Sequence, residues 1–209
     1  MKRTVKIISL ILVLSVVVGC VFALSACNKN DNEHKEKLVV GLECAYIPFN
    51  FTQMTDANGA VKISNAEGYA NGYDILIAKR IADALGKELV ITKLDWDSLV
   101  PGVKAGTLDL IIAGMSPTAE RRESIDFSDS YYESNLVIVV RQDGRYARAT
   151  SLADFAGANL VAQQGTFHDA ALEAQAATYG ITRGTPMATF PDMTVALNSK
   201  AIDGYVAEE

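Results

Sequence analysis

The stretch Gly72–Gly114, GYDILIAKRIADALGKELVITKLDWDSLVPGVKAGTLDLIIAG, decides the fold class. Its first part carries apolar residues three and four positions apart, which predicts a helix with one buried face that ends at Gly86. That face consists of Ile75, Ala78, Ile81, Ala82 and Leu85. A run rich in β-branched residues, a second helix from Trp96 and an apolar run ending at Gly114 follow. This alternation predicts parallel strands with crossover helices, the α/β class.

The same alternation continues on both sides of this stretch. Upstream, Lys37–Leu42 predicts a strand, and the Asn58-Gly59 pair after it predicts a small hairpin. Downstream, strands are expected at residues 135–141, 159–163 and 201–209, and helices at 166–180 and 190–200. The second half of the chain therefore repeats the scheme of the first.

An internal similarity supports two related halves. Residues 96–114 and 190–208 align without gaps, and the alignment pairs Trp96 with Phe190 and Asp109 with Asp203. It also places Gly114 and Glu208 at equivalent positions, each at the carboxyl end of a central strand. Ligands of open α/β sheets bind outside those strand ends.

The N-terminus has the pattern of an export signal. Residues 1–26 join a basic start to a continuous apolar run, and LSAC at Leu24–Cys27 resembles the lipobox of bacterial lipoproteins. We therefore expect a lipoprotein signal peptide at 1–26, lipid attachment at Cys27 and a polar tether at 27–36. Cys20 ends a weaker lipobox. A retained membrane helix is the alternative, because about 20 apolar residues can span a bilayer.

Composition excludes several classes of function. The net charge is -6, and beyond residue 26 the chain has 16 basic against 25 acidic residues, so a basic nucleic-acid footprint is absent. His34 and His168 are the only histidines, too few for a usual zinc site, and no phosphate-binding glycine motif occurs. We expect no metal and no cofactor. His168, at a helix start, is expected to face solvent.

Cys44 has no partner for an internal disulfide if Cys20 is removed with the leader and Cys27 is lipidated. It is then either a buried hydrophobic residue or part of a cleft wall. Burial is favoured, because free cysteine is among the most buried residue types.

Several blocks together resemble the polar amino-acid solute-binding proteins of ABC importers, family 3 of the bacterial extracellular solute-binding proteins. The blocks are GLECAYIPFNF, NGYDILIAKRIADALGK, WDSLVPGVKAGTLDLIIAGMSPTAERRESIDFSDSYY, QGTFHD and AIDGYVAEE, and the resemblance runs from about Lys37 to Glu209. It implies a type II periplasmic-binding-protein-like fold, in which two α/β lobes joined by a hinge close on a ligand. Residues 37–135 would form lobe 1 and residues 136–209 lobe 2.

The resemblance also implies that the chain is C-terminally truncated. Family members complete the second lobe, return through the hinge and finish the first lobe with further helices. The second lobe and the return to the first are therefore expected to be incomplete, and apolar faces are expected to remain exposed.

For the ligand's carboxylate, the resemblance points to Arg121, whose planar fork suits a carboxylate. Ser116 would contact the zwitterion, and the carbonyl of Ala113 or Gly114 would accept from its ammonium. A solvated surface charge is the alternative for Arg121, and a helix cap is the alternative for Ser116. Arg122 is expected to point elsewhere.

In the second half, Gly165, Thr166 and Phe167 precede a helix whose free N–H groups attract an anion. Thr166 and the N–H of Phe167 are expected on the far side of the carboxylate. Glu208 takes the position of an acid that holds the ammonium, where many family members carry Asp. Its place one residue from the chain end leaves fraying as the alternative.

Side-chain recognition is assigned by the resemblance to Tyr46 and Trp96, which would stack on the ligand. A place in the core is the alternative for Trp96. Glu43 matches the position where binders of basic amino acids carry an acid, which indicates a polar or cationic ligand.

The resemblance therefore implies a non-enzymatic receptor. It would bind a free L-amino acid outside the cytoplasm, as a monomer anchored through Cys27, and deliver it to the membrane subunits of an ABC permease. A cyclohexadienyl-type dehydratase on the same fold is the alternative, with Glu43 or Glu208 as its acid or base. A sensor module of a membrane kinase is a third possibility.

Overall fold

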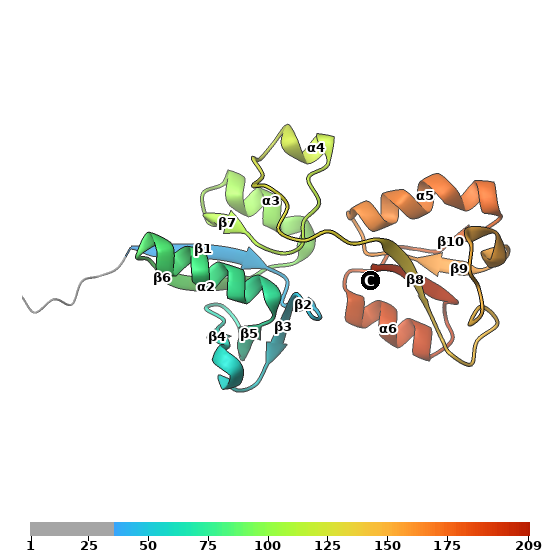
Figure 1. Ribbon diagram of the computed structural model, residues 1–209, viewed down its shortest axis with the longest axis horizontal. Coiled ribbons are helices and arrows are strands. Elements are labelled where there is room, and N and C mark those ends of the chain that lie inside the picture. Colours follow the sequence, from blue (N-terminus) through green and yellow to red (C-terminus); the bar gives the residue numbers. More distant parts are fainter. Residues whose placement is uncertain (1–35) are drawn as a thin grey trace, which may run out of the picture. The chain divides into compact units, whose positions relative to one another are not determined.

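The computed structural model describes residues 36–209. The predicted signal peptide, Cys20, Cys27 and the tether up to Lys35 lie outside the described residues. Figure 1 shows an α/β protein whose strands gather into three sheets. Within residues 36–209, no helix combines the length and apolar character that are needed to cross a bilayer.

The first sheet is parallel, as predicted. Its strands are β1 (Lys37–Leu42), β6 (Glu88–Lys93) and β7 (Leu110–Ile111), in the order β6-β1-β7. The connecting helices are α2 (Tyr73–Leu85), which packs on β6, and α3 (Trp96–Lys104), which packs on β1 and β7. β7 is an edge strand of this sheet, so the segment before Gly114 is not central, contrary to the prediction.

The predicted face of α2 is confirmed except at its end. Ile75, Ala78 and Ala82 are buried, and Gly86 caps the helix with φ 67°, in the left-handed region that glycine favours. Leu85, predicted to be buried, is 56% exposed. It is the last residue of the helix and lies beyond the part that packs on β6.

The hairpin prediction is wrong in its pairing. Residues 45–71 form an antiparallel sheet in the order β2-β3-β5-β4, and a 3-10 turn, η1 (Ala57–Gly59), holds the Asn58-Gly59 pair. The strands are β2 (Ala45–Tyr46), β3 (Asn50–Gln53), β4 (Val61–Lys62) and β5 (Tyr69–Asn71). The two strands that flank the turn, β3 and β4, do not pair with each other, because β5 lies between them.

The third sheet contains the second half of the chain. Its strands are β8 (Leu136–Val140), β9 (Asn159–Val161), β10 (Thr182–Arg183) and β11 (Gly204–Glu208), in the order β10-β9-β11-β8. β9, β10 and β11 are parallel, whereas β8 is antiparallel to β11 and departs from the predicted scheme. The chain runs from β8 to β9 through loops and the short helix η2 (Leu152–Phe155), and in the sheet β11 lies between these two strands.

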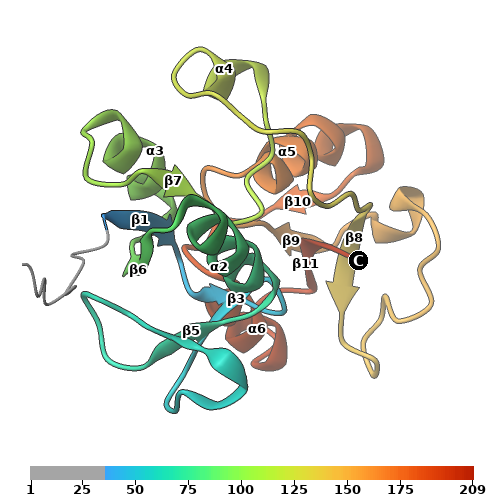
Figure 2. The ribbon, with the colours of Figure 1, turned by 60° about the vertical axis from the view of Figure 1, so that its left-hand side comes forward.

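Two longer helices flank this sheet. They are α5 (Phe167–Tyr179) and α6 (Phe190–Asn198), and Figures 1 and 2 show them on opposite sides of the strands. Thr166 and Thr189 cap these helices by accepting from the N–H groups of Asp169 and Asp192. The end of β11 lies close to the start of α5, where the side chain of Glu208 contacts His168.

The buried apolar side chains fall into separate cores. One core takes its buried residues from between Leu38 and Ala113, and the others take theirs from between Tyr146 and Val206. We call the part of the chain around the first core the first lobe and the part around the others the second lobe.

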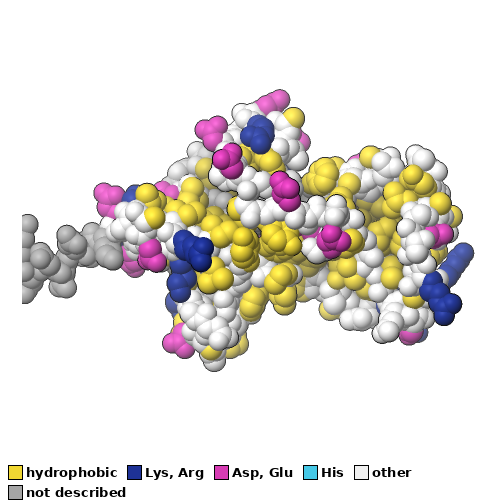
Figure 3. All heavy atoms as spheres, viewed as in Figure 1, with side chains coloured by type: hydrophobic (Ala, Val, Ile, Leu, Met, Phe, Trp, Pro, Cys, Tyr) yellow, Lys and Arg dark blue, Asp and Glu magenta, His cyan; other side chains and the backbone are white. Residues whose placement is uncertain are grey.

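The first lobe also has a wide apolar groove beside β7. Ile77, Ile81 and Val103 line it together with Leu110 and Ile111 of the strand itself. The segment that carries α4 (Ala119–Arg122) overhangs it, and Figure 3 shows apolar side chains gathered below this segment. Apolar surface of this kind agrees with the expectation of exposed faces.

Candidate functional site

Residues of both lobes line one small cavity. The lining consists of Glu43, Tyr46, Trp96, Ala113, Gly114, Ser116, Arg121, Gln163, Thr166, Phe167, His168 and Phe190. Of the residues predicted for the site, only Gly165 and Glu208 are missing from this lining, and both bond to side chains within it. The enclosed space has room for about one water molecule.

Arg121 extends from α4 toward the second lobe. Its Nη1 donates to the carbonyl of Ser116 at 2.9 Å, and its Nη2 donates to the carbonyl of Gly165 at 3.0 Å. The guanidinium carbon lies 5.2 Å from the centre of the Trp96 ring. Partial burial lowers the pKa of Arg121. Both carbonyl groups that accept hydrogen bonds from its guanidinium are uncharged. Arg122 instead bonds to Pro117 and points away, as predicted.

The carbonyl of Gly165 joins the two lobes. It accepts from Arg121 and also from the indole Nε1 of Trp96 at 3.1 Å. Gly165 has φ 67°, and a Cβ at this position would collide with the carboxylate of Asp97. Glycine suits this left-handed backbone conformation, and any other residue would also force the Asp97 carboxylate to move.

Glu43 is a buried carboxylate, 6% exposed, that follows β1. Its Oε1 accepts from Nε2 of Gln163, in the second lobe, at 2.7 Å. Burial raises the pKa of Glu43 to about 7, and this single amide donor only partly opposes the effect. The site thus contains an acid that is poorly stabilised in its ionised form.

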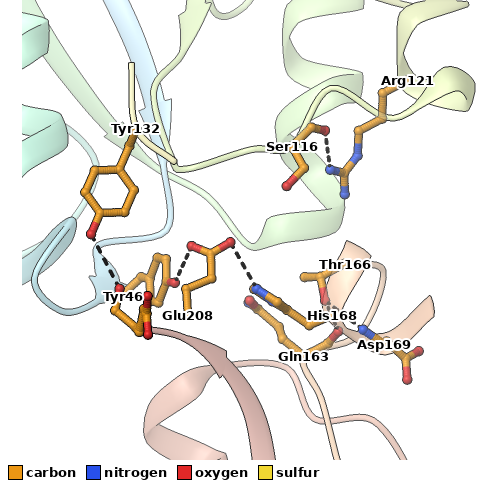
Figure 4. A network of polar contacts seen from close by, with 10 residues as sticks. Tyr46, Ser116, Arg121, Tyr132, Gln163, Thr166, His168, Asp169 and Glu208 are labelled. Atoms are coloured by element: carbon orange, nitrogen blue, oxygen red, sulfur yellow. Dashed lines mark hydrogen bonds and ion pairs between the residues drawn. The ribbon is translucent and has the colours of Figure 1, made fainter. Parts of the chain in front are cut away.

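Glu208 is held between two side chains, as Figure 4 shows. Tyr46 donates to its Oε2 at 3.1 Å, and His168 Nε2 lies 3.3 Å from its Oε1. Glu208 also lies in register with Leu136 of β8, so the fraying alternative is excluded. The prediction for His168 is wrong: the side chain is buried, because the first turn of α5 faces the end of β11 rather than solvent.

The ring of Tyr46 stacks on aromatic rings of both lobes. Its centroid lies 5.0 Å from that of Phe49 and 4.4 Å from that of Phe190, with small interplanar angles. Phe190 was not predicted for the site. The internal alignment pairs it with Trp96, and this was the signal in the sequence that could have identified it.

Some of the polar groups that are predicted to contact the ligand's carboxylate already form hydrogen bonds within the protein. Thr118, not Ser116, caps α4 by accepting from the N–H of Arg121, so the hydroxyl of Ser116 remains on the cavity wall. The hydroxyl of Thr166 donates to the carbonyl of Gln163 at 2.6 Å and caps α5. The side chain of Phe167 lies half-exposed at the first position of that helix.

A buried chain of hydrogen bonds supports Gly114. Its N–H donates to the phenol oxygen of Tyr131 at 2.9 Å, and Tyr131 donates to Asp74 Oδ1 at 3.0 Å. Asn50 donates to the other oxygen of Asp74 at 2.8 Å. Asp74 is completely buried, and burial raises its pKa to about 6. Sequence reasoning missed this network because Asp74 lies at the start of an otherwise ordinary amphipathic helix.

Cys44 lies next to Glu43, with φ 54° and its side chain 3% exposed. Burial raises the pKa of its thiol to about 12. The prediction of burial is confirmed, and an un-ionised thiol is a poor nucleophile.

The comparisons with known proteins point to one family. The sequence model for bacterial extracellular solute-binding proteins, family 3, matches residues 38–187. The arginine-binding extracellular protein ArtP of Bacillus subtilis is 28% identical over 200 residues, which cover 94% of this chain and 72% of ArtP. The chain spans between 51% and 72% of the length of three curated relatives of this kind.

Solved structures of amino acid-binding proteins are also similar to this chain. An amino acid ABC transporter substrate-binding protein from Streptococcus pneumoniae, bound to L-arginine, has a TM-score of 0.71 and 30% identity, covering 82% of this chain and 66% of that one. The ancestral amino acid-binding protein AncCDT-1, described as a precursor of cyclohexadienyl dehydratase, has a TM-score of 0.69 and 26% identity, covering 82% and 70%.

Proposed function

Because the chain belongs to the bacterial extracellular solute-binding proteins of family 3, we propose that it is a receptor for a free L-amino acid. The ligand binds between the two lobes and is delivered to an ABC permease. Among its relatives, ArtP is an arginine-binding protein and the pneumococcal structure contains L-arginine. We extend this preference to the chain and propose a ligand with a cationic side chain.

One observation carries the proposal: a single cavity is lined by a guanidinium, Arg121, and by a buried carboxylate, Glu43. A basic amino acid has complementary groups, a carboxylate at one end and a cation at the other. Arg121 would exchange two neutral carbonyl acceptors for a carboxylate, which forms stronger, charge-assisted bonds.

Glu43 favours a cation for a separate reason. Its ionised form is disfavoured by burial and has one amide donor, Gln163. A ligand ammonium or guanidinium beside it would supply the missing opposite charge and lower its pKa. A neutral side chain would leave this cost in place, so the preference for a cation follows from the protein's own electrostatics.

Ligand entry requires the lobes to separate, because the cavity has room for about one water molecule. The contacts that would open include those of Gly165 with Arg121 and Trp96, of Gln163 with Glu43, and of Tyr46 with Phe190 and Glu208. We place the lobe boundary between residues 135 and 136, with lobe 1 at 37–135 and lobe 2 at 136–209. The hinge lies where the chain enters β8.

The remaining residues keep their predicted roles in this proposal. Ser116, Ala113, Gly114 and the N–H of Phe167 surround the ligand's α-carbon groups, and Glu208 holds its ammonium. At the N-terminus, residues 1–26 form the signal peptide and residues 27–36 form the tether. Lipid on Cys27 anchors the protein, as a monomer, to the outer face of the cell membrane.

A thermal-shift screen of the standard amino acids and ornithine tests the proposal, since a ligand that binds only the folded protein raises its Tm. L-arginine, L-lysine or L-ornithine should give the largest shift. Glu43→Gln should reduce the preference for these ligands by at least about ten-fold in Kd. Glu67→Gln, which changes an exposed carboxylate, is the matched control and should leave it unchanged. A largest response to a neutral amino acid would contradict the cationic assignment.

The dehydratase alternative is favoured by one observation, the pKa of about 7 at Glu43. A carboxyl group with that pKa suits general acid catalysis near neutral pH. Turnover of a cyclohexadienyl acid, lost in Glu43→Gln, would establish it.

A further inference from the structure

The proposed site leaves one titratable side chain without a role, the imidazole of His168. The residue is buried, 8% exposed, and lines the cavity. It comes from the first turn of α5 and faces the end of β11, where Glu208 lies. A histidine in this place can control the carboxylate beside it.

Glu208 is fixed at both of its oxygens. His168 Nε2 lies 3.3 Å from Oε1, and the phenol of Tyr46 donates to Oε2 at 3.1 Å. A carboxylate can accept about four hydrogen bonds. Contacts from Tyr46 and His168 therefore hold the long glutamate side chain in one orientation, and Ser134 also bonds to it. Lone pairs remain for a ligand.

The ionised form of Glu208 depends chiefly on His168. The pKa of Glu208 is lowered, with the hydrogen bond from His168 as the largest cause and the bond from Tyr46 as a smaller one. The imidazole therefore favours the carboxylate form of Glu208, which is the form that binds an ammonium group.

The second ring nitrogen of His168 has no partner of its own in the described part of the chain. Nδ1 is buried and has no hydrogen-bond partner within residues 36–209. In neutral imidazole one nitrogen donates and the other accepts, so a donor to Glu208 at Nε2 leaves Nδ1 as an acceptor. The contact with Glu208 is therefore the polar contact that the described residues give this imidazole.

The surrounding charges come from several elements. Glu208 on β11 contacts the imidazole, and Tyr46 on β2 contacts Glu208. Glu43 and Arg121 line the same cavity. Phe190 of α6 packs edge-on against the ring and brings no charge. On α5 itself, Asp169 forms an ion pair with Arg183 rather than with His168.

On the premise of the proposed function, we propose that His168 is the positioning residue of the amino-group subsite. The imidazole holds Glu208 in place for the ligand's ammonium, so ligand affinity depends on a hydrogen-bond donor at this position.

The test is the Kd of L-arginine, measured by calorimetry at pH 8 for the wild-type chain, His168→Gln and His168→Ala. Glutamine keeps an uncharged N–H donor, so its affinity should stay within about three-fold of the wild type, whereas alanine should lose about ten-fold.

The decisive comparison is between the two variants, because only glutamine restores a donor to Glu208. The Kd of His168→Ala should exceed that of His168→Gln by about three-fold or more. Equal Kd values in the two variants would overturn the proposal.

A ligand-independent measurement separates this inference from the proposed function. If the wild-type chain binds none of the amino acids, the proposed function fails, and NMR titration of the Glu208 carboxyl group tests His168 directly. The pKa of Glu208 should rise in His168→Ala. An unchanged pKa would show that His168 does not hold the carboxylate.

Discussion

Asp109 and Asp203 make the same pair of hydrogen bonds in two different sheets. The carboxylate of Asp109 accepts from the N–H of Val39 at 2.7 Å, and its own N–H donates to the carbonyl of Val39 at 2.8 Å. Asp203 does the same with Asn159, at 2.8 Å and 2.9 Å. The internal similarity in the sequence therefore corresponds to one structural device used twice, an aspartate that clamps a neighbouring parallel strand.

Replacing either aspartate with alanine should destabilise the chain by similar amounts, about 1 kcal/mol each, because each variant loses one carboxylate bond to a strand N–H. Urea unfolding followed by circular dichroism measures this. Asp83→Ala, on the exposed side of α2, is the control and should change the free energy of unfolding by less than about 0.5 kcal/mol. A loss at only one of the two aspartates would contradict their equivalence.

Gly165→Ala and Gly86→Ala form a matched pair, since both glycines have φ 67°. Each variant should lose about 1 to 2 kcal/mol of stability through left-handed backbone strain. Only Gly165→Ala brings a Cβ against Asp97 and Trp96, whereas no atom lies within 4 Å of a Cβ at Gly86. Ligand affinity, measured by calorimetry, should fall in Gly165→Ala and persist in Gly86→Ala.

Tyr131→Phe should weaken ligand binding although Tyr131 does not line the cavity. It removes the phenol that accepts from the Gly114 N–H and donates to Asp74. A half-buried N–H and a buried carboxylate oxygen then lose a partner, which should cost about 1 to 3 kcal/mol of stability. Tyr132→Phe is the control, because that phenol makes only a long, exposed bond to Glu209. Equal affinities in the two variants would rule out a positioning role for Tyr131.

Glu43 should make the stability of the ligand-free protein depend on pH. Its pKa rises from 4.5 to about 7 on folding, so the folded state retains a proton that the unfolded state has lost. The resulting stability is fully present below pH 4.5 and is lost as pH rises through about 7. Relative to the wild type, Glu43→Gln should therefore gain about 3 kcal/mol between pH 4 and pH 8. Unfolding by urea at a series of pH values provides the measurement, and parallel curves for the two proteins would contradict it.

Periodicity in the sequence predicts the order and type of the main elements, because α2, α5 and α6 each bury one face on a sheet. It does not predict strand pairing. β5 separates β3 from β4, and β8 runs against its neighbour, since pairing depends on long-range contacts that a local turn signal such as Asn58-Gly59 does not contain.

Within the site, the sequence predicts residues that carry a family motif and misses those that act through tertiary contacts. Arg121, Glu43 and Tyr46 reach the cavity as the resemblance implies. The burial of His168 depends on the end of β11, forty residues later in the chain. Nothing near His168 in the sequence indicates that contact.

Cys44 offers a chemical probe of how often its surroundings open. The thiol is buried beside Glu43 in the core of the first lobe, and it is the only thiol within residues 36–209. With Cys20 and Cys27 replaced by serine, the rate of alkylation by a small uncharged reagent would report how often this part of the core is exposed. A bound solute that stabilises the folded first lobe should slow the alkylation, so a side chain of the native protein can follow solute binding without an attached dye.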